Sequence, residues 1–166
     1  MGNYTFTKKE RLCNKRTISA LYAGAHRFMA FPLSVHWMAV EHSRTASPLQ
    51  VVIVAPKKKL RHAVDRNRAK RMMRECYRMR KQKIAETLAH HDRAVAVGIN
   101  YVHHTIIPFQ QMSKQFDKVF DTLSRQLEEW ISDEKNQKAA NQTAEATAEP
   151  PQKEASQKAT PVTPAP

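Results

Sequence analysis

Apolar and polar residues alternate or cluster along the chain in ways that predict three strands. Residues 32–40 alternate between apolar and polar side chains, which is typical of a strand with one buried face. The run 49–55 is continuously apolar and rich in β-branched residues, and Pro56 ends it. That composition predicts a central strand buried on both faces. A further short apolar run at 94–99 predicts another strand.

A short helix is predicted ahead of these strands. Asn14 is a suitable N-cap for a helix through Ala23, with Gly24 as the residue just past its end. Thr7 and Glu10 form a competing capping box, so the sequence leaves two possible starts.

Two longer helices are predicted further along, a basic one after the second strand and an amphipathic one after Pro108. A polar break at 90–93 ends the basic helix. The last helix has apolar residues spaced by three and four; these are Met112, Phe116, Val119, Phe120, Leu123, Leu127, Trp130 and Ile131. The order α-β-β-α-β-α, with an extra short strand near Phe28, predicts an α/β (α+β) fold, a single two-layer sandwich of helices on a small sheet.

The composition changes sharply near Glu134. Beyond it the chain is mostly Ala, Gln, Lys, Glu, Thr and Pro, with almost no apolar residue larger than Ala. We therefore expect one domain over 1–133 and a disordered low-complexity tail over 134–166. The tail has four Lys and four Glu, so the formal net charge of +13 belongs to the domain.

Positive charge concentrates in the basic helix and the loop before it. The segment from Lys57 to Lys83 holds thirteen Lys or Arg against only Asp65 and Glu75, a net charge of about +11. Such a density repels itself unless phosphates neutralise it, which indicates a nucleic-acid partner. A merely solvated helix face is the alternative.

The helical spacing separates this charge from the apolar residues. One arc of the helix holds Asn67, Lys70, Arg71, Arg74, Arg78 and Lys81. The opposite arc holds Ala69, Met72, Met73, Cys76, Tyr77 and Ile84. One face can therefore pack on a core while the other presents cations to phosphates, which favours binding over simple solvation.

The run from Lys58 to Glu75 reads Lys-Lys-Leu-Arg-His-Ala-Val-Asp-Arg-Asn-Arg-Ala-Lys-Arg-Met-Met-Arg-Glu. It resembles the signature of the bacterial ribonuclease P protein subunit, and the resemblance extends over about 6–131. The resemblance implies an α/β sandwich with an unusual left-handed β-α-β crossover. It also implies a protein cofactor of a catalytic RNA, in a ribonucleoprotein endonuclease (a hydrolase) that removes the 5′ leader from precursor transfer RNA.

The resemblance carries two sets of residues onto this chain. The positions that match the family's RNA-contact motif are Lys58, Lys59, Arg66, Asn67, Arg68, Lys70, Arg71 and Arg74. A groove for the single-stranded leader is implied at Ile18, Tyr22, Val35 and Trp37. Because Ile18 and Val35 cannot stack on a base as an aromatic ring does, the candidates for stacking are Tyr22, Phe28, Phe31, His36 and Trp37.

The polypeptide shows no catalytic constellation of its own. Asp117 and Asp121 share a helix face, but the helix is otherwise an ordinary amphipathic one. The histidine pairs at 90–91 and 103–104 have no cysteine or carboxylate partners at metal-ligand spacing. We therefore expect no catalytic residue and no dedicated metal ligand in the protein. Mg²⁺ is expected to act with the RNA subunit.

The remaining features bear on location and on rival functions. Two cysteines give no disulfide framework, and the chain has no signal peptide or membrane-spanning segment, so we expect a cytoplasmic protein without membrane association. The expected partners are the ribonuclease P RNA and the precursor leader, with no protein partner evident. A structural RNA-binding protein, such as a ribosomal component, is the main alternative. A regulator of duplex DNA is disfavoured because no helix-turn-helix spacing accompanies the basic helix.

Overall fold

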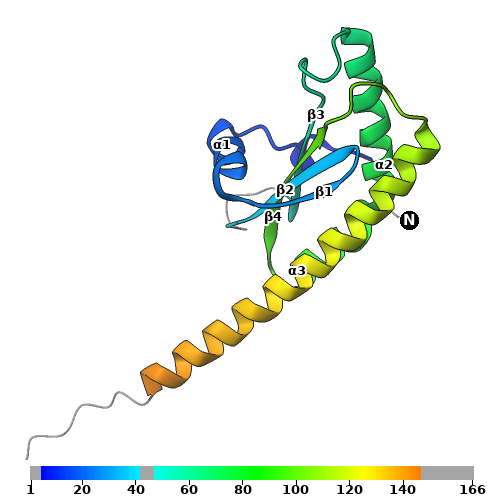
Figure 1. The fold of residues 1–166 in the computed structure, drawn as a ribbon. Coiled ribbons are helices and arrows are strands. Elements are labelled where there is room, and N and C mark those ends of the chain that lie inside the picture. The colour runs from blue at the N-terminus through cyan, green and yellow to red at the C-terminus, as the bar shows by residue number, and fades with distance from the viewer. Residues whose placement is uncertain (1–4, 42–46, 147–166) are drawn as a thin grey trace, which may run out of the picture. The chain divides into compact units, whose positions relative to one another are not determined.

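The computed structural model describes residues 5–41 and 47–146 (Figure 1). The chain divides into two compact units, Met1–Glu129 and Trp130–Pro166. In its described part, the second unit is the end of a helix that begins in the first. All packing described below lies within the first unit.

The elements follow the order α-β-β-β-α-β-α, preceded by one 3₁₀ turn. Their bounds are η1 Lys8–Glu10, α1 Lys15–Gly24, β1 His26–Ala30, β2 Leu33–Val40, β3 Leu49–Val54, α2 Ala63–His90, β4 Ala94–Tyr101 and α3 Phe109–Ala146. The mixed α/β class predicted from the sequence is confirmed, and the extra short strand is β1. The hand of the crossover from β3 through α2 to β4 stays a prediction.

The four strands form one sheet in the order β1-β2-β4-β3. β2 is antiparallel to both of its neighbours, and β3 is parallel to β4. The prediction that 49–55 forms a central strand is wrong, because β3 lies at an edge and β4 is central. The apolar run has another cause: the segment before α1 lies along β3, with Leu12 N donating to Val51 O at 3.0 Å, so this edge strand is also covered.

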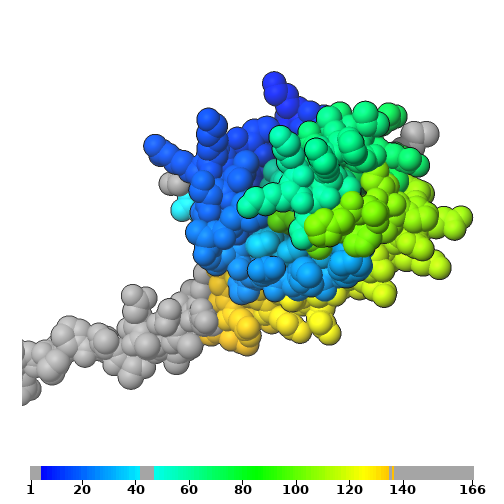
Figure 2. Space-filling model, turned by 45° about the horizontal axis from the view of Figure 1, so that its top comes forward, coloured from blue at the N-terminus to red at the C-terminus, as the bar shows by residue number. Residues whose placement is uncertain are grey.

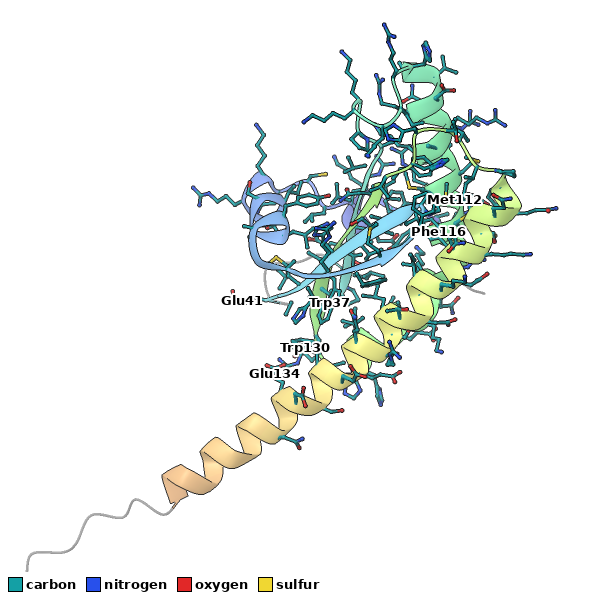
Figure 3. The ribbon with its side chains drawn as sticks, in the orientation of Figure 1. Trp37, Glu41, Met112, Phe116, Trp130 and Glu134 are labelled. Atoms are coloured by element: carbon teal, nitrogen blue, oxygen red, sulfur yellow. The ribbon has the colours of Figure 1, made fainter. Side chains whose placement is uncertain are left out.

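The main core lies between one face of the sheet and the pair α2 and α3 (Figure 1). Trp37 of β2 is 2% exposed, and its indole N–H donates to Gln126 Oε1 of α3 at 2.8 Å. Met112 and Phe116 point from α3 toward the sheet and are fully buried (Figure 3). Alternate residues of β2 thus face the helical layer, as the period of two requires.

The short helix α1 covers part of the opposite sheet face. Asn14 is its N-cap, with Arg16 N donating to Asn14 Oδ1 at 3.0 Å, as predicted. Gly24 is the last helical residue and has no positive φ, so the predicted role of Gly24 just past the helix end is corrected. Leu21 packs with Ala96 of β4. A Cβ atom at Gly98 would lie 3.1 Å from the side chains of α1, so this glycine permits the close approach.

An ion pair connects the N-terminal segment to α2. Lys81 is 6% exposed, and its Nζ donates to Glu10 Oε1 at 2.6 Å and to the carbonyl oxygen of Thr5. The sequence places Lys81 on the basic arc, and the structure corrects this: Thr5 and Glu10 lie over that part of α2 and bury it. Glu10, the acidic residue of this segment, is thereby turned inward, away from its basic neighbours.

The last helix extends further than the apolar pattern predicts. α3 continues to Ala146, past residue 134 where the predicted tail begins. Residues 134–146 are mostly Ala, Gln, Lys, Glu and Asn, and several of these have high helix propensity. Residues 147–166 lie outside the described part, and the predicted boundary at 133/134 stays a prediction. None of the described helices is both long and apolar enough to cross a membrane.

Removing the buried cation should destabilise the fold. Lys81→Ala leaves the Glu10 carboxylate buried without its partner, and we expect a loss of about 3 kcal/mol or more in the free energy of unfolding. The matched control is Lys83→Ala, on the same helix but exposed, which should change stability by less than about 0.5 kcal/mol. Urea unfolding followed by circular dichroism measures both. Equal, small changes in the two variants would show that the pair contributes nothing to stability.

Candidate nucleic-acid interface

The residues predicted to contact RNA all reach the surface of α2 and of the loop before it. Lys58, Asn67, Arg68, Arg71 and Arg74 are exposed. Lys59, Arg66 and Lys70 are half-buried. Figure 2 looks onto this end of the molecule, where the loop and the start of α2 lie between α1 and the segment that leads into α3. Many nitrogen-tipped side chains project here (Figure 3).

The buried face of α2 explains this arrangement. Its buried residues follow helical spacing and pack toward the sheet and α3; they are Ala69, Met73, Cys76, Tyr77, Lys81, Ile84 and Leu88. Because the apolar arc is fixed by burial, the opposite arc of the same rigid helix faces solvent, except at Lys81, which the N-terminal segment covers. The other cations of α2 are therefore presented at helical spacing, whereas Lys58 and Lys59 stand on the loop before it.

The loop before α2 is tied to the helix by one of the predicted contact residues. Leu60 is buried and anchors the loop, and its N–H donates to Pro56 O at 3.1 Å. The Arg66 guanidinium donates through Nη1 to Leu60 O at 3.1 Å and to Arg61 O at 2.7 Å. Arg66 therefore holds the loop against the helix start, in addition to any contact with RNA.

Two acidic side chains, Glu75 of α2 and Asp117 of α3, are paired with arginines of α2. Glu75 accepts from Arg78 Nε at 3.0 Å, and this hydrogen bond lowers the pKa of the Glu75 carboxyl. Asp117 of α3 accepts from Arg80 Nε at 2.5 Å. The Asp117 carboxylate thus serves as a helix-to-helix contact. Among the described residues, Arg68, Arg71 and Arg74 form no ion pair, so their guanidinium groups can bind a polyanion.

The predicted leader groove is only partly assembled. Tyr22 is 40% exposed on α1, and Ile18 packs half-buried in the cluster beneath the same helix. Val35 and Trp37 are 0% and 2% exposed and face the helical layer, so their assignment to the groove is corrected. The physical reason is the alternation of β2, which turns odd-numbered residues to the core and even-numbered ones to the face of α1.

The residues that do lie beside Tyr22 come from β2 and β4. The Tyr22 hydroxyl donates to Asn100 Oδ1 at 2.8 Å, and the Tyr22 and His36 rings meet edge to face at 5.0 Å between centroids. Burial and the neighbouring Arg27 charge lower the pKa of His36, so its ring is neutral at pH 7. We call Tyr22, His36 and Asn100 the open sheet face; it offers rings and an amide, as single-stranded RNA requires.

Sequence reasoning missed one member of the open sheet face and only partly identified another. His36 is among the alternative stacking residues named from the sequence, whereas Asn100 is not singled out there. The sequence does indicate the position of His36, because its apolar neighbours on β2 predict that His36 points to the opposite face of the strand. For Asn100 the pairing of β4 with β2 was needed, which places Asn100 opposite Ser34.

The described residues include no cluster that could hold a metal ion, and the buried Cys76 thiol is not activated. No group of three or more His, Cys, Asp or Glu residues in that part of the chain could hold a metal ion. Burial raises the pKa of the Cys76 thiol to about 11, so it stays protonated at neutral pH and is a poor nucleophile.

The comparisons with known proteins all lead to the same family. A family model described as Ribonuclease P matches residues 6–124. The "Ribonuclease P protein component" of Porphyromonas gingivalis is 29% identical over 117 residues, covering 70% of this chain and 85% of that protein. The protein of the same name from Chlorobium phaeobacteroides is 36% identical over 95 residues, covering 56% and 64%. The solved structure of the Staphylococcus aureus RNase P protein has a similar fold, with a TM-score of 0.55 at 17% identity, covering 69% and 94%.

Two neighbouring arginines should differ in their effect on stability. Arg66→Ala removes hydrogen bonds from a charged group to two carbonyls, and we expect a loss of about 1 to 2 kcal/mol in the free energy of unfolding. Arg68→Ala removes an exposed side chain and should change it by less than about 0.5 kcal/mol. Urea titration of both variants without RNA measures the difference. Equal stabilities would mean that the Arg66 contacts are too solvated to contribute.

Proposed function

The chain belongs to the ribonuclease P protein family, and from this premise we propose that its basic helix is the surface that binds the catalytic RNA. It is the protein component of a ribonucleoprotein endonuclease, a cofactor in the processing of transfer RNA 5′ ends, and its partner is the ribonuclease P RNA. The observation that supports the proposed surface is the grouping of eight contact-motif residues on α2 and its loop, with Glu75 and Asp117 already paired with arginines of α2.

The proposed mechanism of binding is electrostatic and positional. The RNA-contact residues would be Lys58, Lys59, Arg66, Asn67, Arg68, Lys70, Arg71 and Arg74. Arginine binds phosphate oxygens in a bidentate manner, and a rigid helix holds several guanidinium groups at fixed spacing. Neutralising RNA phosphates releases counterions and reduces the repulsion within a folded RNA. The protein would thus lower the Mg²⁺ concentration that the RNA needs in order to fold and react.

We further propose that the open sheet face holds the precursor leader. Tyr22 and His36 supply rings for base stacking, and Asn100 supplies an amide that can also reach a base edge. Mature transfer RNA lacks the leader and would lose these contacts. Substrate is then bound in preference to product, which is useful for an enzyme that must release its product.

The proposal also concerns which groups hold Mg²⁺ and where in the cell the protein is located. Mg²⁺ would supply charge neutralisation and an activated water for phosphodiester hydrolysis, and we propose that RNA oxygens hold it. In support, Glu10, Glu75 and Asp117 are each committed to a Lys or Arg partner. We also propose a cytoplasmic location, since the free thiols of Cys13 and Cys76 suit a reducing compartment.

The basic face can be tested through salt dependence. For Arg68→Ala, we expect weaker binding to ribonuclease P RNA and a log-log salt slope that is flatter by about 0.7 to 0.9, since one phosphate contact is lost. The reconstituted enzyme should also need more Mg²⁺ for half-maximal cleavage. The matched control is Arg125→Ala, an exposed arginine of α3, which should bind as the wild type does. Identical slopes for all three proteins would contradict the assignment of Arg68.

The open sheet face can be tested through substrate discrimination. Tyr22→Ala should weaken binding of precursor transfer RNA to the reconstituted enzyme by roughly five-fold to a hundred-fold, because a stacked base is worth about 1 to 3 kcal/mol. Binding of mature transfer RNA should be nearly unchanged. Tyr22→Phe keeps the ring, loses the bond to Asn100, and should retain most of the discrimination. Equal losses for precursor and mature RNA would rule out a leader contact at Tyr22, and a melting curve identifies a folding defect.

A further inference from the structure

A hollow of about 730 Å³ lies where the start of α2 meets the start of α3. Its lining combines polar and apolar side chains; they include Val64, Asn67, Arg68, Arg71, Met72 and Phe109. Figure 2 shows the surface of this part of α2 adjoining the segment that leads into α3. Phe109 stands outside the contact motif, and it brings an aromatic ring to the side of the basic helix.

The apolar members of this lining are unusually exposed. Phe109 is 40% exposed and Val64 is 77% exposed, although both are large hydrophobic residues. Exposed apolar surface beside guanidinium groups fits a ligand that is itself part apolar and part anionic. An unpaired nucleotide has this character, since its base has an apolar face and its phosphates are charged. A protein helix would be a poorer match, because it would leave Arg68 and Arg71 without anions.

Phe109 is held in place from both sides. Downstream, Arg80 of α2 donates to Ser113 Oγ at 2.6 Å and to Asp117 Oδ1 at 2.5 Å, which fixes the first turns of α3 against α2. Upstream, the Tyr101 hydroxyl donates to Thr105 O at 2.6 Å and accepts from Ile107 N at 3.2 Å. These contacts fix the chain on both sides of Phe109, so little backbone entropy is lost when a base stacks on its ring.

The charge of the hollow also favours a nucleotide. Glu75 is its acidic lining residue, and it accepts from Arg78 Nε at 3.0 Å. Its charge is therefore compensated by a cation of the same helix. Arg68 and Arg71 are three residues apart on α2, so they are neighbours on its surface with Cβ atoms about 5 to 6 Å apart, and both can reach one stretch of phosphate backbone. Asn67 adds an amide that can bond to a base edge.

We propose that Phe109 stacks on an unpaired base of the ribonuclease P RNA, while Arg68 and Arg71 bind the phosphates on either side of that base. This contact rests on the proposed function of the basic face and adds to it a site that reads an extruded nucleotide. The RNA subunit is the expected source of the base, because the hollow is built on the face of α2 assigned to that RNA. The open sheet face lies on the other side of the sheet.

Affinity measurements distinguish stacking from charge. Phe109→Ala should weaken binding of the ribonuclease P RNA by roughly five-fold to a hundred-fold. Its log-log salt slope should equal that of the wild type, because no charge is removed. Phe109→Trp should bind at least as tightly as the wild type, and Phe109→Leu should bind almost as weakly as Phe109→Ala. The matched control is Met79→Ala, an apolar residue of α2 that is 41% exposed and does not line the hollow; it should have no effect.

Each contrary result has a distinct meaning. Affinity of Phe109→Ala within two-fold of the wild type, or Phe109→Leu binding as well as wild type, would overturn the stacking proposal. If Arg68→Ala still flattened the salt slope, the basic face would stand without the stacking site. If neither variant changed binding, the proposed function of α2 itself would fail. Melting curves without RNA exclude loss of fold, and Phe109→Trp serves as the folded variant if Phe109→Ala unfolds.

A photo-crosslink tests the source of the base. With p-benzoylphenylalanine at position 109 of the full chain, irradiation of the reconstituted enzyme should crosslink an unpaired nucleotide of the RNA subunit, with or without substrate. Crosslinks that require precursor transfer RNA and map to its leader would overturn the proposal. Crosslinks spread over duplex regions would overturn it as well, since a stacking site needs an unpaired base.

Discussion

The rest of the structure depends on how one helix carries a dense positive face while its other face stays buried. α2 packs with small and apolar residues such as Ala69, Met73 and Cys76, so it lies close to the sheet and cannot rotate. The carboxylates of Glu10, Glu75 and Asp117 are all engaged with cations of this helix. Lys81 and Arg80 fasten the N-terminal segment and α3 to it, while the cations nearer its start point outward. Charges that hold the fold together and charges that face solvent are thus separated along a single helix.

Two surfaces with different chemistry result from this arrangement. The basic face of α2 carries guanidinium and ammonium groups, which suit phosphates. The open sheet face carries aromatic rings and an amide, which suit bases. The sheet separates them, because α1 lies on one of its faces and α2 on the other (Figure 1). Strand β4 serves both sides: Ile99 and Tyr101 are in the core, and Asn100 between them faces Tyr22. A change in β4 that shifts its register by one residue would exchange these roles.

Many of the helices and strands, and the faces they bury, could be predicted from local patterns in the sequence. The helical spacing of α2 and α3, the cap at Asn14 and the alternation in β2 are set by residues close in sequence. The errors concern long-range pairing. Lys81 has a helical position typical of the basic arc, and only Glu10, which comes from the other end of the domain, explains its burial. The edge position of β3 likewise depends on which strand pairs with β4, and its apolar run does not carry that information.

The groove was the least predictable part of the interface, for the same reason. Trp37 has an aromatic ring suited to a base contact, but Trp37 and Val35 belong to the face of β2 that packs under α3. Asn100 acquires a role only when β4 is inserted between β2 and β3. Where resemblance to a family matches residues within one helix, helical spacing alone decides which side of the helix they face. Where a groove is formed by three separate elements, an error of one residue along a strand assigns a side chain to the wrong face of the sheet.

The central position of β4 in the sheet also determines the order in which the strands can pair while the chain is being synthesised. β1 and β2 can form a hairpin as soon as they leave the ribosome, but β3 is joined to them only through β4, which is the last of the described strands to be synthesised. The basic helix therefore emerges before the sheet that buries its apolar side can be completed. For that interval an unfinished, strongly cationic chain lies beside the RNA surface of the ribosome itself. Rapid closure of β4 into the sheet would shorten the time in which nascent α2 can bind the wrong RNA.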